Sequence, residues 1–214
     1  MKQLAQKKVK LEAKQEEHHC QELEDIANMI RLESVQMTDA SKSGHPTSCA
    51  SLAELLACLF FSPQGMRLDV QQPNRYEAER LVLSKGHAAP ALYSAWHLAG
   101  YLSKEEIMTL RQIDSRIEGH PMPNMPFVDV ATGSLGQGLG VAAGLAYSHQ
   151  YLDQNNHRSF AILGDGEAQE GSIWEAAHFA GHYKLRHLVA FLDCNRMGQS
   201  FLLGDNAPTY LKRF

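Results

Sequence analysis

Two short polar motifs follow apolar runs that have the composition of buried strands. The motif Gly-Asp-Gly-Glu at residues 164–167 comes directly after Phe160–Leu163, and Asn195 comes directly after Leu188–Asp193. Roughly 30 residues separate Asp165 from Asn195, which suits one strand–helix–strand unit. The two strands of such a unit point the same way, so their carboxyl ends meet at one edge of the sheet. We therefore expect Asp165 and Asn195 to lie together there, where open α/β sheets bind ligands.

These two side chains predict a metal and phosphate site. A carboxylate and an amide oxygen are hard ligands that suit Mg²⁺ or Ca²⁺. Only Asp165 is charged, which leaves coordination positions for a diphosphate and water, and the flanking glycines let the backbone approach phosphate oxygens. Alone, a Gly-Asp-Gly tripeptide would be interpreted as a turn. The asparagine at this spacing favours the site.

Three histidines, His45, His87 and His120, each follow a glycine in a predicted loop. Singly, each could simply cap a turn. Three such loops favour a shared site, where imidazole groups can move protons among hydroxyls near neutral pH. The glycine-rich stretch 133–140 does not follow the G-x-G-x-x-G pattern, so it does not predict a dinucleotide site.

Strands and helices alternate along the chain, which predicts an α/β fold with a parallel sheet wrapped by helices. The predicted strands are 81–83, 160–163 and 188–193, with a brief extended segment at 127–130. The predicted helices include 22–40, 141–151 and 172–183, and one that opens at the capping box of Ser103 and Glu106. The small residues of 140–146 would let their helix approach a neighbour closely.

The composition excludes several classes of protein. With 44% apolar residues, 21% charged residues and a net charge of −4, the chain is ordinary for a globular protein and has no basic footprint for nucleic acid. It shows no apolar stretch long enough to span a membrane. Its four cysteines form no C-x-x-C pair, which favours a reducing, cytoplasmic setting.

Several further segments carry a resemblance to a known family. They are Ser-Gly-His-Pro-Thr-Ser at 43–48, Leu-Ser-Lys-Gly-His-Ala at 83–88, Glu-Gly-His-Pro at 118–121, and Asp-Val-Ala-Thr-Gly-Ser-Leu-Gly-Gln-Gly at 129–138. Asp165 and Asn195 at their spacing would also fit pyruvate dehydrogenase components and deoxyxylulose-phosphate synthase. Together with these segments, the chain resembles the animal-type transketolases over roughly residues 22–200, in the family's order. Glu118 stands where that family usually has an aspartate, and the family pattern ends after Gln199.

The resemblance implies a thiamine diphosphate-binding fold and a set of site residues. The metal, Mg²⁺ with Ca²⁺ or Mn²⁺ as alternatives, would be held by Asp165, the side chain of Asn195 and the carbonyl of Met197. The cofactor would contact Ser48, His87, the backbone of Gly133, Ser134 and Leu135, and, at its diphosphate, Gly166 and Asn195. The sugar substrate would face His45, His87 and His120.

The resemblance also implies an activity and an organisation. The activity is transfer of a two-carbon ketol unit from a ketose phosphate to an aldose phosphate in the pentose phosphate pathway. We expect a polar extension at 1–21 and a diphosphate-binding domain at 22–214, truncated at its end. The pyrimidine-binding domain, with the glutamate that activates the cofactor, would come from elsewhere, so a homodimer or a partner chain is expected. The alternatives are a module that binds thiamine diphosphate and metal without turnover, or a truncated chain that pairs with other subunits.

Overall fold

The computed structural model describes residues 2–197, with side chains from residue 18 onward. Residues 198–214, the end of the predicted domain, lie outside the described residues. Three strands form the sheet: β1 (Arg80–Leu83), β2 (Ser159–Gly164) and β3 (Leu188–Asp193). They are parallel and lie in the order β1-β2-β3. The predicted α/β architecture is therefore confirmed.

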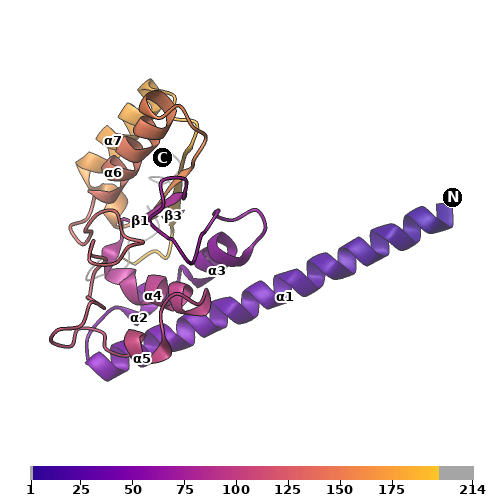
Figure 1. Cartoon of the computed structure of the whole chain (residues 1–214), viewed down its shortest axis with the longest axis horizontal. Coiled ribbons are helices and arrows are strands. Elements are labelled where there is room, and N and C mark those ends of the chain that lie inside the picture. The colour runs from indigo at the N-terminus through magenta and orange to yellow at the C-terminus, as the bar shows by residue number, and fades with distance from the viewer. Residues whose placement is uncertain (1, 198–214) are drawn as a thin grey trace.

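Helices cover both faces of the sheet (Figure 1). They are α1 (Lys2–Ser41), α2 (Pro46–Ala50), α3 (Ala53–Phe61), α4 (Ala89–Leu98), α5 (Lys104–Ile107), α6 (Gly138–Tyr147) and α7 (Gly171–His182). Short 3₁₀ turns occupy η1 (Gly86–Ala88) and η3 (Glu167–Gln169), and the π-helical turn η2 (Ser148–Leu152) extends α6.

Alternate residues of β2 supply two separate cores. Phe160 and Ile162 join the larger core, which contains residues of α1, α3 and α4. Ala161 and Leu163 join the smaller core formed with α6 and α7. This division follows from the two-residue period of a strand, whose successive side chains point to opposite faces. Because both faces are covered, β2 is buried along its whole length.

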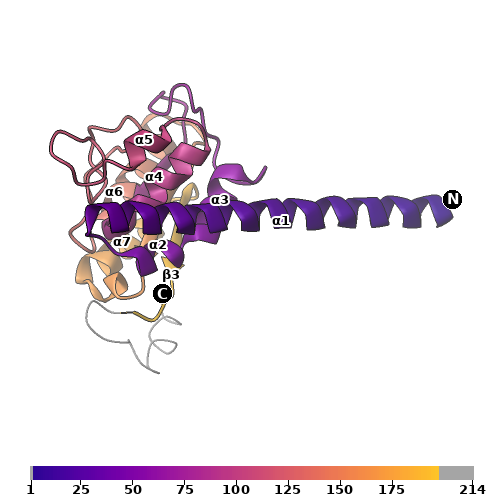
Figure 2. The same cartoon turned by 90° about the horizontal axis from the view of Figure 1, so that it is seen from below.

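The first helix is longer than the predicted 22–40. It contains 40 residues, about 60 Å at the usual helical rise, and its N-terminal half extends away from the other elements (Figures 1 and 2). Its second half has the predicted buried face, since Ala27, Ile30 and Met37 have no exposed surface. Among residues 2–197 no helix has the length and apolar character needed to cross a bilayer.

One prediction of local structure is wrong. The segment 127–130 forms turns and bends rather than an extended segment: Val128 N–H donates to the carbonyl of Met125 at 3.0 Å. Phe127 and Val128 are nevertheless buried, and Phe127 stacks on Trp96 with ring centroids 4.6 Å apart. The helix predicted at 141–151 already begins at Gly138.

The small residues of α6 do not all serve close packing. Ala142 and Ala146 are buried as expected, but a Cβ at Gly144 would meet nothing within 4 Å. The tight contact is instead at Gly138, where a Cβ would collide with the Ser84 side chain. The expected serine N-cap is confirmed, because Glu106 N–H donates to Ser103 Oγ at 3.1 Å, while the carboxylate of Glu106 pairs with Arg116.

Candidate cofactor and metal site

The carboxyl ends of β2 and β3 place Asp165 beside the segment that carries Asn195. Gly164 pairs with Asp193 in the parallel register, and Asp165 N–H donates to the carbonyl of Asp193 at 3.1 Å. The sheet thus brings together the two motifs whose spacing predicted a shared site.

Asp165 is buried, with 1% exposure, and within residues 18–197 its carboxylate accepts hydrogen bonds from backbone N–H groups alone. One carboxylate oxygen accepts from Gly166 N–H at 2.9 Å, and the other accepts from Arg196 N–H at 2.7 Å. Within residues 18–197 no lysine or arginine side chain forms an ion pair with this carboxylate. A buried carboxylate without a cationic partner is costly, which fits a site that takes a cation.

The other two expected ligands lie at the end of β3. Asn195 Nδ2 donates to Ser51 Oγ at 3.3 Å, and its Oδ1 accepts from Met197 N–H at 2.9 Å. An amide oxygen has two lone pairs, so Oδ1 keeps one acceptor position. Over the described residues no group of three His, Cys, Asp or Glu side chains could enclose a metal. Asp165 and Asn195 supply one carboxylate and one amide oxygen, which fits a metal that shares its coordination shell with a ligand such as a phosphate.

The buried Lys85 fastens α2 to the end of β3. Its Nζ lies 2.5 Å from Asp193 Oδ2 and 3.3 Å from the carbonyl of Ser48. Ser51 Oγ donates to the same Asp193 oxygen at 2.5 Å. This network fixes Ser48, an expected cofactor contact, beside the metal motif. Nothing local in the sequence predicts a role for Lys85 or Asp193, because the two residues pair across 108 residues.

The three histidines come from three loops and converge at this edge. The rings of His45 and His87 meet edge to face with centroids 5.3 Å apart. The ring of His120 lies over Gly133, where a Cβ would stand 3.0 Å from His120 Cδ2. Gly133 also has a φ of +143°, so glycine suits the position twice over.

Burial keeps two of these imidazoles neutral. It lowers the pKa of His87 to about 4, assisted by the positive charge of Lys85 and by repulsion from His45 and His120 when these are protonated. Burial, followed by the charges of Arg111 and His45, also lowers the pKa of His120. At pH 7 His87 is therefore neutral and can both donate and accept a hydrogen bond.

The glycine-rich loop is pressed against the segment that follows β1. Thr132 Oγ1 donates to the carbonyl of Leu83 at 2.7 Å, and a Cβ at Gly86 would stand 2.7 Å from Thr132 Oγ1. Ser134 is exposed and Leu135 is half-buried. The contacts of Thr132 with Leu83 and Gly86 therefore hold the start of the backbone of 133–135, the expected cofactor contact, against the end of β1.

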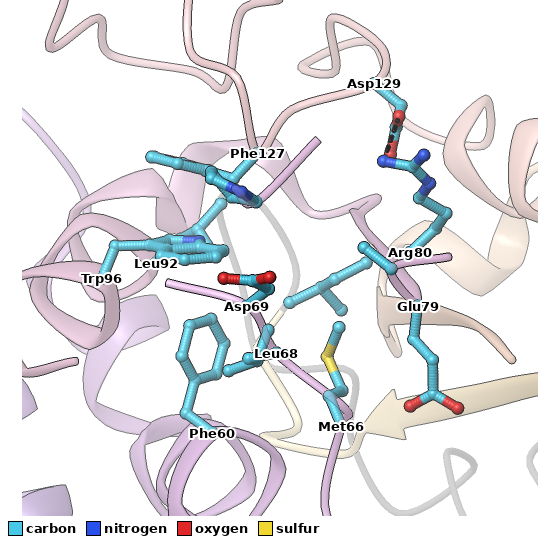
Figure 3. Close-up of a pocket in the computed structure, with 13 residues that line it drawn as sticks. Phe60, Met66, Leu68, Asp69, Glu79, Arg80, Leu92, Trp96, Phe127 and Asp129 are labelled. Carbon is cyan, nitrogen blue, oxygen red and sulfur yellow. Dashed lines mark ion pairs between the residues drawn. The ribbon is translucent and has the colours of Figure 1, made fainter. Parts of the chain in front are cut away.

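A separate hollow lies at the opposite edge of the sheet and contains none of the predicted site residues. Figure 3 shows Phe60, Trp96 and Phe127 on one side of it and Glu79 with Arg80 on the other. Arg80 pairs with Asp129 at 3.3 Å. The hollow has a volume of about 10 Å³, space for no more than about one water, so it cannot hold a cofactor.

Comparison with known proteins gives consistent matches. The sequence model for "Transketolase, thiamine diphosphate binding domain" matches residues 23–200. Human transketolase is 54% identical over 195 residues, which cover 91% of this chain and 30% of that protein. A 6-deoxy-6-sulfo-D-fructose transketolase subunit from a Clostridium species is 42% identical, with 82% of this chain and 63% of that protein covered.

Solved structures agree with the sequence matches. Transketolase from Campylobacter jejuni superimposes with a TM-score of 0.82 and 33% identity, over 90% of this chain and 32% of that one. A Pichia stipitis transketolase in complex with xylulose 5-phosphate gives a TM-score of 0.77 and 32% identity, over 82% of this chain and 27% of that one. The chain thus spans about 30% of the length of the transketolases that it matches.

Proposed function

Because the chain belongs to the transketolase family, we propose that it provides the diphosphate and metal half of a thiamine diphosphate site. The observation that carries the proposal is the buried carboxylate of Asp165, which accepts from the backbone N–H groups of Gly166 and Arg196 and lies beside the segment of Asn195. A divalent cation bound there would neutralise Asp165 and bridge to a diphosphate.

The proposed metal ligands are Asp165, Asn195 Oδ1 and the carbonyl of Met197. They are all oxygens, which suits Mg²⁺, with Ca²⁺ or Mn²⁺ as substitutes. Gly166 and Asn195 would also contact the diphosphate. The remaining proposed cofactor contacts are Ser48, His87 and the backbone of Gly133, Ser134 and Leu135. The Lys85–Asp193 pair supports this assignment, since it holds Ser48 against the same strand end.

The proposed reaction is transfer of a two-carbon ketol unit from a ketose phosphate to an aldose phosphate, as in the pentose phosphate pathway. When bound, thiamine diphosphate supplies the nucleophilic carbon and the electron sink for this chemistry. His45, His87 and His120 would form hydrogen bonds to the hydroxyl groups of the sugar and exchange protons with them. The lowered pKa of His87 supports the hydrogen bonding, because a neutral imidazole can both donate a hydrogen bond to a hydroxyl group and accept one at pH 7.

Activity is proposed only for an assembly that contains more than these 214 residues. The expected glutamate that activates the cofactor belongs to a pyrimidine-binding domain, which would come from a second copy of a longer chain in a homodimer or from a separate partner. The Clostridium relative is named as a subunit, which supports the second arrangement.

Four free cysteines support a reducing, cytoplasmic setting.

A reconstitution assay tests the proposed function. The 214-residue chain is mixed with Mg²⁺, thiamine diphosphate, xylulose 5-phosphate and ribose 5-phosphate, and ketol transfer is followed with coupling enzymes. We expect no turnover by the chain alone and turnover after addition of a polypeptide carrying the pyrimidine-binding domain. Turnover without that polypeptide would contradict the incomplete-site account. Cofactor binding with no turnover in any combination would favour the non-catalytic module.

A further inference from the structure

A second buried carboxylate, Glu167, joins three segments around the candidate site. It is 2% exposed and begins the turn η3. Its Oε1 accepts from Ser84 Oγ at 2.5 Å and from Gly136 N–H at 2.9 Å, while Oε2 accepts from Gly164 N–H at 3.1 Å. One side chain therefore connects the end of β1, the glycine-rich loop and the end of β2.

Each of these segments is close in sequence to an expected ligand of the cofactor or the metal. Gly136 follows the backbone of 133–135, Gly164 precedes Asp165, and Ser84 stands three residues before His87. Gly136 is fixed from its other side too, because Ser172 Oγ donates to its carbonyl at 3.0 Å. Its φ of +90° requires a left-handed conformation that glycine adopts without strain. Hydrogen bonds on both sides of Gly136 therefore fix the glycine-rich loop directly after 133–135, the backbone expected to contact the cofactor.

The negative charge of Glu167 does not explain why a carboxylate occupies this buried position. Within residues 18–197 no lysine or arginine side chain forms an ion pair with it, and a carboxylate near a diphosphate is repulsive. From its three donors, we infer that Glu167 is a positioning residue, which holds the backbone of 133–136 and the end of β2 in the geometry that receives the diphosphate. This inference rests on the proposed function.

Glu167→Gln separates positioning from charge. The carboxamide keeps the shape but has one acceptor oxygen and one donor nitrogen, so either Gly136 N–H or Gly164 N–H must face another donor. If positioning dominates, the affinity of the chain for thiamine diphosphate with Mg²⁺ falls by about 10- to 100-fold, as for other residues that orient metal ligands. If charge repulsion dominates, the affinity rises. The control is Glu24→Gln, which removes the same charge at an exposed site on α1 and should leave affinity unchanged.

Amide hydrogen exchange of the cofactor-free chain gives a second readout, which a general loss of stability would not reproduce. In Glu167→Gln we expect faster exchange at Gly136 or Gly164, with the interior of β2 at Ile162 unchanged. A uniform rise in exchange over all strands would show a merely structural role and would overturn the inference. Should this variant fail to fold, Ser84→Ala, which removes one of the three donors, is expected to give a smaller loss of affinity in the same direction.

The outcomes distinguish this inference from the proposed function. If the unaltered chain binds thiamine diphosphate and Glu167→Gln binds it equally or more tightly, only the role of Glu167 is overturned. If the unaltered chain does not bind in saturating Mg²⁺, the proposed function fails and the role of Glu167 fails with it.

Discussion

Both edges of the sheet bury carboxylates, but the carboxylates have different partners. At the amino edge, the side chain of Glu79 has no exposed surface and receives Arg158 Nε at 2.6 Å and Arg67 Nε at 3.1 Å. At the carboxyl edge, Asp165 and Glu167 receive backbone N–H groups and one hydroxyl group. Arginine side chains neutralise Glu79, whereas no lysine or arginine side chain within residues 18–197 pairs with Asp165 or Glu167.

This difference separates a structural ion pair from a ligand site. The arginines also lower the pKa of Glu79 against the opposing effect of its burial. At the carboxyl edge Asp193 does have a cationic partner, Lys85, which also holds α2 in place. Asp165, directly beside it, remains available to a metal. Both edges contain buried charge, so burial does not distinguish them. They differ in their cations: arginine side chains pair with Glu79, whereas a bound metal ion is proposed to pair with Asp165.

The largest expected effect is at the unneutralised edge. Asp165→Ala removes the only charged ligand of the proposed metal, so binding of thiamine diphosphate with Mg²⁺ should be abolished, a loss of more than about 100-fold. Asn195→Ala should weaken binding by about 10- to 100-fold. Titration calorimetry measures both affinities. Unchanged affinity in Asp165→Ala would remove Asp165 from the site.

Glu79→Ala tests the neutralised edge. We expect the free energy of unfolding to fall by about 1–3 kcal/mol, because two arginines lose their buried partner. Since the pKa of Glu79 is lowered in the folded state, the stabilisation is present above the usual pKa of 4.5 and is lost as the pH falls below it. Urea unfolding at pH 7 and pH 3.5 should therefore show a smaller difference between the variant and the unaltered chain at the lower pH. Cofactor affinity should not change, and a loss of affinity would mean that the two edges are not independent.

Two glycines of α6 test whether the carboxyl edge is closely packed, because Gly138 lies against Ser84 and Gly144 lies in open space. Gly138 begins the helix beside Ser84, where a Cβ would collide, so Gly138→Ala should destabilise the chain by about 1–3 kcal/mol. Gly144 is exposed, with nothing near its Cβ position, so Gly144→Ala should stabilise it by about 0.4–1 kcal/mol through the unfolded state. Thermal unfolding of the two variants should give shifts of opposite sign. Shifts of the same sign would contradict the close packing described at the carboxyl edge.

The smallest effect concerns protonation near neutral pH. Because burial lowers the pKa of His87 to about 4, its ring should stay neutral in the folded chain at pH 5–8. The unfolded chain binds this proton near the usual pKa of 6.5, so the contribution to stability declines as the pH falls from 6.5 towards 4. An NMR titration of the ring of the cofactor-free protein measures this directly. A midpoint near 6.5 would show that His87 is solvated rather than buried among charges.

Much of the fold could be predicted from local patterns. Apolar runs of strand length gave all three strands within about one or two residues, the usual uncertainty of element ends. The separation of Asp165 from Asn195 correctly placed their segments at adjacent strand ends, because parallel strands determine where carboxyl ends meet. The segment 127–130 was misinterpreted because buried aromatic packing and a strand have the same apolar composition.

The contacts that organise the site could not be predicted in this way. Lys85 pairs with Asp193, and Glu167 pairs with Ser84, across 108 and 83 residues. Neither pairing leaves a periodic or local pattern in the sequence, because each pair forms only when distant segments pack together in the folded chain. Gly138 lies close to Ser84, and Gly86 lies close to Thr132, because two loops approach each other there. The composition of the sequence does not indicate which glycines make such close contacts.

The central claim is that the carboxyl edge accepts a diphosphate only together with a divalent cation. The most direct test is calorimetric titration of the unaltered chain with thiamine diphosphate, once in saturating Mg²⁺ and once in excess EDTA. The account predicts saturable binding to one site per chain in Mg²⁺ and no detectable binding in EDTA. Equal affinity in both buffers, or no binding in Mg²⁺, would contradict it.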